Sequence, residues 1–222
     1  MNVSLASSTF RDGGMKAQMP YKETDPRRLI VIPRWSGTPA SDWYPWITSE
    51  LNAFQPRPFD PVVVAAMPDP DEPTIPAWVG RVRQLLGDDP DEIARTVMVG
   101  HSVGCQAILR ALAELPEGAH VNGVLCVAGW LWTDEPWDSL IPWIETPFVP
   151  ARTRDAANRR IVVMMSDNDP YTFDWRAHRA AWQERLGGSV TMVSGVEHFN
   201  GEQYPIILQT LLDHFAHRET DS

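Results

Sequence analysis

Short, nearly unbroken runs of apolar residues recur along the whole chain. They are Leu29–Ile32, Val62–Ala66, Thr96–Val99, Val121–Val127, Ile161–Met165 and Val190–Val193. A strand that is covered on both faces has this continuous apolar pattern, whereas a strand with one wet face alternates apolar and polar side chains. The pattern therefore predicts six parallel strands in one buried sheet.

The segments between these runs have the apolar spacing and the start signals of helices. They are the stripe Trp43, Trp46, Ile47 and Leu51 after Ser41, the segment Trp78–Leu86 after Thr74 and Pro76, and the segments Val103–Leu115, Phe173–Leu186 and Gln203–His217. Right-handed crossovers between parallel strands put such helices on both faces of a sheet. We therefore predict an α/β fold, a three-layer α/β/α sandwich around a six-stranded, mainly parallel sheet.

Two stretches depart from this alternation. Residues 1–28 show no apolar period, which predicts a poorly ordered leader before a single domain at residues 29–222. Residues 129–160 contain four Trp and four Pro without a clean period, so we expect a cap or a long loop there. A chain of 222 residues with 43% hydrophobic and 22% charged residues is sufficient for one such domain.

The net charge and the two cysteines limit which classes of partner and which cellular compartment are expected. A formal net charge of -10 repels phosphate backbones and anionic lipids, and no Lys/Arg cluster reverses it, so we expect no nucleic-acid or membrane partner. Cys105 and Cys126 lie in apolar surroundings, which predicts buried free thiols. No signal-peptide pattern and no apolar run of ~18 residues is visible, so we expect a cytoplasmic protein by elimination.

The candidate nucleophile is Ser102, in a segment at residues 100–104 that reads GHSVG and matches G-x-S-x-G. The segment follows the run Thr96–Val99 and leads into the helix Val103–Leu115. Small residues two positions before and after the serine permit a sharp turn, which lifts the hydroxyl above the carboxyl edge of the sheet. An ordinary helix N-cap serine is the alternative. On such a turn the side chain of His101 points away from the serine, so we expect His101 to be structural.

A serine hydroxyl needs a base to take its proton and a carboxylate to orient that base. Of the six histidines, His198 alone follows a predicted strand, at the edge where parallel sheets collect functional groups. Two aspartates follow the run Ile161–Met165: Asp169 has the spacing of the acid, and Asp167 could cap the turn. We therefore predict a catalytic triad of Ser102, His198 and Asp169, in the chain order Ser, Asp, His of the α/β-hydrolases.

An oxyanion hole needs two backbone N–H donors. The first is expected from Val103, directly after the nucleophile, and the second from Trp35 in the loop after the first strand, with Arg34 as the alternative. The tryptophans of the predicted cap offer large walls for an acyl group, and Trp130 and Trp143 are the candidates for substrate binding. The alternative is that these rings fill the core at the edge of the sheet.

From Arg28 onward, these motifs make the chain resemble the small serine-hydrolase family of retinoblastoma-binding protein 9 and the bacterial YdeN-like proteins. The resemblance rests on Pro33 and an S-G turn after the first strand, a W-x-x-W helix at Trp43 and Trp46, the GHSVG segment, Pro142-Trp143, the segment SDNDP at residues 166–170, and His198-Phe199. It implies a Ser-His-Asp triad of Ser102, His198 and Asp169 on a compact α/β-hydrolase sheet, with strand order 2-1-3-4-5-6. The chain departs from the family at Arg34 and Glu197, where Gly is usual.

The expected activity is that of a carboxylesterase-like serine hydrolase, acting on small apolar or aromatic carboxylic esters through an acyl-serine intermediate. Without zinc-ligand spacing, a G-x-G-x-x-G or a P-loop pattern, we expect neither a metal nor an organic cofactor. The expected partner is a small-molecule acyl substrate. A thioesterase or amidase would use the same triad, and a non-catalytic protein-binding module could keep the same fold.

Overall fold

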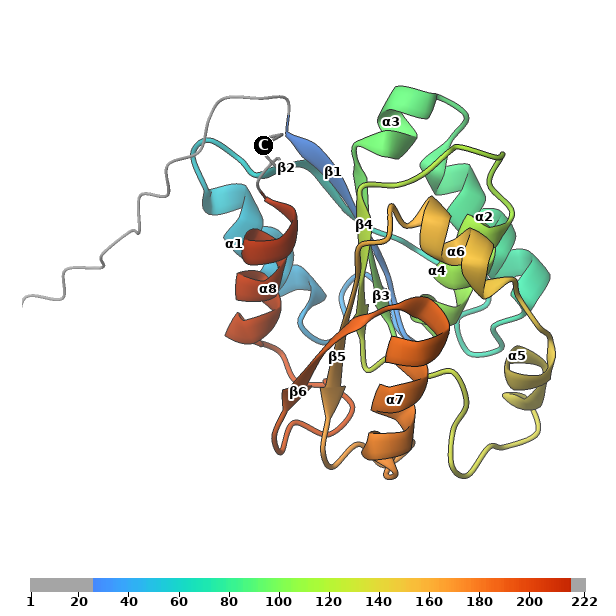
Figure 1. Cartoon of the computed structure of the whole chain (residues 1–222). Coiled ribbons are helices and arrows are strands. Elements are labelled where there is room, and N and C mark those ends of the chain that lie inside the picture. The colour runs from blue at the N-terminus through green and yellow to red at the C-terminus, as the bar shows by residue number, and fades with distance from the viewer. Residues whose placement is uncertain (1–25, 217–222) are drawn as a thin grey trace, which may run out of the picture.

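The computed structural model describes residues 26–216. Within this range, six strands form one sheet in which all strands are parallel (Figure 1). The strands are β1 (Arg27–Ile32), β2 (Phe59–Val64), β3 (Thr96–His101), β4 (Gly123–Val127), β5 (Ile161–Ser166) and β6 (Ser189–Val193). Their order in the sheet is β2-β1-β3-β4-β5-β6, which confirms the predicted order.

Helices cover both faces of this sheet, so the three-layer sandwich is confirmed. They are α1 (Tyr44–Ala53), α2 (Ile75–Leu86), α3 (Pro90–Ala94), α4 (Val103–Ala113), α5 (Ile141–Glu145), α6 (Pro150–Ala156), α7 (Trp175–Leu186) and α8 (Pro205–Phe215). α1 and α8 lie on one face, and α2, α4, α6 and α7 lie on the other (Figure 1). Within residues 26–216, no helix combines the length and the apolar character that a membrane crossing requires.

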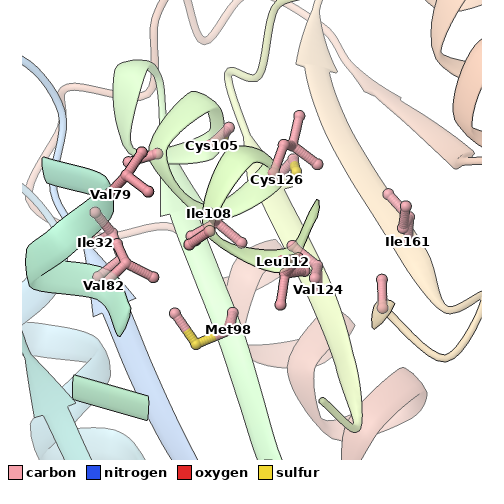
Figure 2. Packing of buried hydrophobic residues seen from close by; sticks show 14 of the residues in the cluster. Ile32, Val79, Val82, Met98, Cys105, Ile108, Leu112, Val124, Cys126 and Ile161 are labelled. Carbon is pink, nitrogen blue, oxygen red and sulfur yellow. The ribbon is translucent and has the colours of Figure 1, made fainter. Parts of the chain in front are cut away.

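The larger core lies between the sheet and the helices α2 and α4 (Figure 2). Val79 and Val82 of α2 lie beside Ile32 of β1, and Ile108 of α4 packs in the same cluster. α4 is buried along most of its length because it packs against β3 and against both α2 and α6. Burial of a whole helix explains why its sequence is apolar almost all round.

The first two strands begin earlier in the chain than the sequence predicts. The predicted leader lies outside the described residues as far as residue 25, and Arg27 and Arg28 already belong to β1. β2 begins at Phe59 rather than Val62 and passes through Pro61. β2 is an edge strand, where a proline is tolerated because one side of the strand has no ladder to complete.

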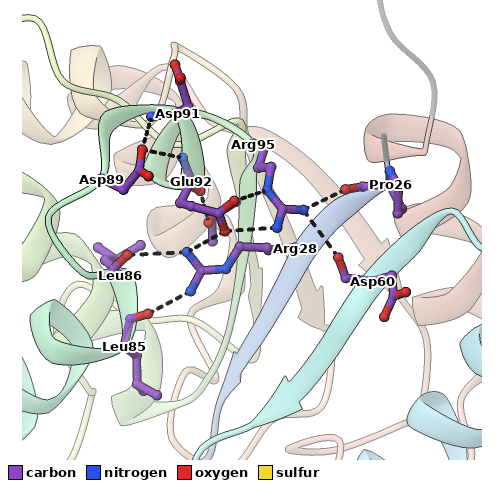
Figure 3. Close-up of polar contacts among 10 residues, drawn as sticks. Pro26, Arg28, Asp60, Leu85, Leu86, Asp89, Asp91, Glu92 and Arg95 are labelled. Carbon is purple, nitrogen blue, oxygen red and sulfur yellow. Dashed lines mark hydrogen bonds and ion pairs between the residues drawn. The ribbon is translucent and has the colours of Figure 1, made fainter. Parts of the chain in front are cut away.

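A polar network closes the amino edge of the sheet, around the unpredicted helix α3 (Figure 3). The Asp89 carboxylate caps this helix by accepting from the Asp91 amide at 2.9 Å. Arg95, just before β3, pairs with Glu92 at 2.8 Å and donates to the Pro26 carbonyl at 2.8 Å. These contacts tie α3 to the start of β1. They occupy the amino edge of the sheet only, and the carboxyl edge lies at the opposite ends of the strands.

The predicted cap, residues 129–160, is in part a crossover connection that contains two short helices. α6 contacts both α4 and α7, and Thr153 Oγ1 donates to the Leu109 carbonyl at 2.9 Å. In α5, Trp143 is only 2% exposed, donates from Nε1 to the Pro73 carbonyl at 3.0 Å, and lies under the guanidinium of Arg110. Within this segment α5 and α6 are therefore helices rather than a long loop, and both pack on the rest of the domain.

We expect two tryptophans within this connection, Trp143 and Trp137, to differ sharply in their effect on stability. Trp143→Ala should lower the free energy of unfolding by ~3–5 kcal/mol, because it empties a large buried site and leaves the Pro73 carbonyl without its donor. Trp137, which is 41% exposed, is the matched control, and Trp137→Ala should cost less than about 1 kcal/mol. Urea unfolding followed by circular dichroism measures both; equal losses would contradict the assignment of Trp143 to the core.

Candidate active site

Ser102 lies on a sharp turn between β3 and α4, with φ 55° and ψ -120°. A non-glycine residue in this region is strained, so its surroundings must hold it there. A Cβ atom on Gly100 would lie 2.6 Å from the Cys105 nitrogen, and one on Gly104 would lie 2.3 Å from the Ile32 oxygen. Both glycines of the motif are therefore required by close backbone contacts, and the turn is the predicted one.

His198 and Asp169 come from two neighbouring loops at the carboxyl edge, after β6 and β5. His198 Nδ1 lies 2.8 Å from Asp169 Oδ2, and the two residues are only 5% and 2% exposed. The backbone N–H of Tyr171 also donates to Asp169, at 3.0 Å. Because a carboxylate accepts, the imidazole carries its proton on Nδ1 and leaves the Nε2 lone pair free.

Asp167, the alternative acid, is used elsewhere. Its carboxylate accepts from the Ser194 hydroxyl at 2.6 Å and from the Gly195 amide at 2.9 Å. These two hydrogen bonds, the hydroxyl first, lower the pKa of the exposed Asp167 carboxyl. Next to it, Asn168 Oδ1 accepts from the Glu197 amide at 2.9 Å. Asp167 and Asn168 thus fasten the loop that carries His198 to the loop that carries Asp169.

Ser102 and His198 line the same cavity, of about 80 Å3. Its other lining residues are Arg34, Trp35, Val103, Trp130, Thr133, Trp137, Leu140, Tyr171 and Asn200. The Trp130 indole N–H donates to Ser102 Oγ at 3.4 Å, and the Tyr171 ring meets the His198 ring edge to face, with centroids 4.7 Å apart. Of the two tryptophans predicted to bind substrate, Trp130 is brought to Ser102. Trp143 is not, and lines a neighbouring pocket of about 580 Å3.

The two residues predicted to donate the oxyanion-hole amides, Val103 and Trp35, both line the cavity. Val103 is the first residue of α4, where an amide has no acceptor within the helix. In the loop after β1, the amides of Arg34, Ser36 and Gly37 donate to Tyr44 Oη, the Pro70 carbonyl and the Arg34 carbonyl, respectively. Within the described part of the chain, the Trp35 amide has no such acceptor. The geometry therefore favours Trp35 over Arg34 as the second donor.

The positive charge of Arg34, which lines the cavity, is neutralised by a carboxylate of the same chain. The Arg34 guanidinium donates twice to Asp42, from Nε at 2.8 Å and from Nη2 at 3.0 Å, and once to the Trp35 carbonyl. Such a bidentate pair leaves little net positive charge for a ligand. Among residues 26–216, no group of three or more His, Cys, Asp or Glu side chains is arranged to hold a metal ion.

His101 and Tyr44 support the site in a way that the sequence did not reveal. The Tyr44 hydroxyl donates to His101 Nδ1 at 2.7 Å, and His101 Nε2 donates to the His198 carbonyl at 2.8 Å. Burial, followed by the proximity of His198, holds the pKa of His101 well below its usual value. The interpretation of His101 as structural agrees with these contacts. Tyr44 belongs to no motif, so only the folded structure identifies it.

Comparison with known proteins places the chain among hydrolases. The family model described as serine hydrolase matches residues 29–209. YdeN of Bacillus subtilis (strain 168), whose name marks it as a hydrolase, is 23% identical over 194 residues, which are 86% of this chain and 97% of YdeN. The predicted resemblance to YdeN-like proteins is confirmed.

Two solved structures share the fold. The crystal structure of the B. subtilis ydeN gene product has a TM-score of 0.72 and 23% identity, and the match covers 86% of this chain and 100% of that one. Est1E from Butyrivibrio proteoclasticus has a TM-score of 0.59 and 14% identity, with 86% and 88% of the two chains covered. At these identities the likeness shows the α/β-hydrolase fold alone.

The buried, neutral His101 makes the stability of the protein depend on pH. Below the ordinary histidine pKa of about 6.5, the unfolded chain binds a proton at this position and the folded chain does not, so stability falls as the pH drops. The expected slope is up to ~1.4 kcal/mol per pH unit, and the contribution is fully present above the unfolded pKa.

His101→Gln removes this proton uptake and can keep one donor and one acceptor. The variant should be less stable than the wild type at pH 8, and the gap should narrow by that slope below pH 6.5. Urea titrations between pH 5 and 8 measure it. Parallel curves for the two proteins would show that the buried ring takes up a proton in the folded state.

Proposed function

The chain belongs to the serine hydrolase family, and on that premise we propose that it hydrolyses small carboxylic esters with Ser102, His198 and Asp169 as its catalytic triad. The observation that supports this most directly is the buried pair of His198 Nδ1 and Asp169 Oδ2 at 2.8 Å, beside a cavity that Ser102 also lines. The base and the acid of a triad are thus paired, and the nucleophile lies at the same cavity as the base.

The proposed first half-reaction begins with the transfer of the Ser102 hydroxyl proton to His198 Nε2, while Oγ forms a bond to the ester carbonyl carbon. Asp169 keeps the other proton on Nδ1 and stabilises the imidazolium. The amides of Val103 and Trp35 donate to the oxyanion of the tetrahedral intermediate. His198 then returns its proton to the leaving alkoxide as the C–O bond breaks. Water repeats these steps on the acyl-serine and releases the acid.

The resting contact of Ser102 is compatible with this role. Trp130 donates to a lone pair of Oγ, which leaves the hydroxyl proton of Ser102 free to be donated in turn. Among the described residues, no hydrogen bond joins Ser102 Oγ to His198. Catalytic hydrogen bonds are often long in the absence of substrate and tighten in the complex.

The side chains that line the cavity support an apolar acyl group. The cavity beside Ser102 and His198 has a volume of about 80 Å3. The side chains of Trp130, Trp137, Leu140 and Tyr171 form a large part of its wall. Aromatic and aliphatic walls suit the acyl part of small apolar or aromatic carboxylic esters, and the proposal keeps both classes.

We expect Ser102→Ala to abolish labelling by a fluorophosphonate probe and to lower hydrolysis of 4-nitrophenyl acetate by several orders of magnitude, because the nucleophile is lost. His198→Ala should have an effect of similar size, since triad members act as a unit. Circular dichroism should show that both variants fold. Labelling that persists in Ser102→Ala would refute the proposal, and absence of labelling in the wild type would favour a binding protein on the same fold.

The two aspartates of the loop after β5 provide a matched pair for the acid. Asp169→Asn should lower kcat by ~10⁴-fold, because an amide in place of the carboxylate favours the wrong tautomer of His198. Asp167→Asn changes the same atoms two residues away, where the partners are Ser194 and Gly195, and should cost less than about 10-fold. Steady-state kinetics on 4-nitrophenyl acetate decides between them, and the reverse ranking would move the acid to Asp167.

A further inference from the structure

Exposed aromatic rings gather at the cavity of Ser102. Trp137 and Tyr171 both line this cavity, and the two residues are 41% and 37% exposed. Single exposed apolar residues are normal on a protein surface, but aromatic rings that contact one another beside a cavity mark a binding surface. Since both residues are open to solvent and line the cavity, a ligand that enters the cavity can reach them.

The two rings belong to an aromatic row, formed by His198, Tyr171, Trp137 and Trp35. The Tyr171 ring meets the His198 ring with centroids 4.7 Å apart and an angle of 77° between the planes. The Trp137 ring lies 5.8 Å from that of Tyr171, and the Trp35 ring lies 5.6 Å from that of Trp137. Aromatic rings prefer such tilted and edge-to-face contacts, and the ring of a ligand can add to the row with the same geometry.

Hydrogen bonds hold both ends of the aromatic row in place. The Tyr171 amide donates to the Asp169 carboxylate, and the Tyr171 carbonyl accepts from the Asp134 amide, each at 3.0 Å. At the other end, Trp35 Nε1 donates to the Asp71 carbonyl at 3.0 Å. Binding to rings that are already ordered avoids the entropy cost of fixing mobile side chains.

The proposed mechanism assigns the aromatic row to one part of the ester. His198 returns its proton to the leaving alkoxide, so the alcohol oxygen must come within hydrogen-bonding distance of Nε2. Tyr171 lines the cavity and its ring contacts the His198 ring, so the alcohol part of the substrate begins beside Tyr171. Trp130 instead donates to Ser102 Oγ, the atom that binds the acyl carbon, and therefore lies on the acyl side.

We propose that Tyr171 and Trp137 bind the alcohol part of the substrate, and that this part carries a neutral aromatic ring, as in benzyl esters. This inference rests on the proposed function, and it leaves the wall near Trp130 to the acyl group. The ring is neutral because Arg34, the charged residue of the lining, is already paired with Asp42. An aromatic ring also gains contacts with the aromatic row that an aliphatic group of similar size does not make.

The test compares three esters that differ in the nature or the place of one ring. Benzyl acetate carries the aromatic ring on the alcohol, and cyclohexylmethyl acetate replaces it by an aliphatic ring of similar size. Methyl phenylacetate, an isomer of benzyl acetate, carries the same aromatic ring on the acyl group. In a pH-stat, the wild type should show a kcat/KM about 10-fold higher for benzyl acetate than for cyclohexylmethyl acetate, after correction for the alkaline hydrolysis rate of each.

Variants then locate the ring of the substrate. Trp137→Ala should lower kcat/KM about 10-fold more on benzyl acetate than on methyl phenylacetate, because only the ring of benzyl acetate meets the aromatic row. Trp137→Phe keeps a ring and should keep most of the preference. Phe173 is the matched control, because it is 57% exposed in the same loop as Tyr171 but lies outside the lining of the cavity. Phe173→Ala should change neither ratio by more than about 2-fold.

Two results would overturn the inference. One is a wild type that hydrolyses benzyl and cyclohexylmethyl acetate with the same kcat/KM, and the other is a Trp137→Ala variant that loses the same factor on both isomers, as a residue of the acyl side or a purely structural residue would. The proposed function fails separately, if Ser102→Ala hydrolyses 4-nitrophenyl acetate as fast as the wild type. Hydrolysis of 4-nitrophenyl acetate that depends on Ser102, without a preference for benzyl acetate, refutes the present inference alone.

Discussion

The rest of the site depends on the close approach of α4 to the end of β1. Gly104 lies so near the Ile32 and Pro33 carbonyls that no Cβ fits between them, and Gly100 is equally close to Cys105. This contact fixes where the helix begins, and therefore holds Ser102 in its strained conformation. It also brings the Val103 amide beside the loop that follows β1. One steric contact thus sets the relative positions of the proposed nucleophile and both proposed oxyanion donors.

A chain of neutral hydrogen bonds also ties the base to this centre. The Arg34 amide donates to Tyr44, Tyr44 donates to His101, and His101 donates to the His198 carbonyl. One chain of contacts thus joins the loop after β1, the start of α1, the end of β3 and the loop after β6. A chain of this kind requires a neutral His101, which burial provides. Buried hydrogen bonds of this type have fixed directions and are insensitive to salt, and they suit a site in which the orientation of one imidazole matters.

The sequence was sufficient for the sheet and for the candidate triad because both leave local signals. Continuous apolar runs mark strands covered on both faces, and the glycines at 100 and 104 mark a turn too tight for side chains. Short helices such as α5 and α6, of five and seven residues, leave no periodic stripe. The sequence also could not predict that Trp130 lies at Ser102 and that Trp143 does not. Trp143 is positioned by contacts with Pro73 and Arg110, which are far away in the chain.

The connection from β4 to β5 has two parts with different roles, one at the cavity and one in the core. Its first part, which includes Trp130, Thr133 and Trp137, lines the cavity, whereas α5 and α6 pack against the core helices. The chemistry we propose depends on the turn at Ser102 and on the loops after β5 and β6, none of which this connection supplies. Substrate selection can therefore reside in part in a few side chains of one loop, whose backbone is held by His178, while the reacting groups are positioned independently by the sheet.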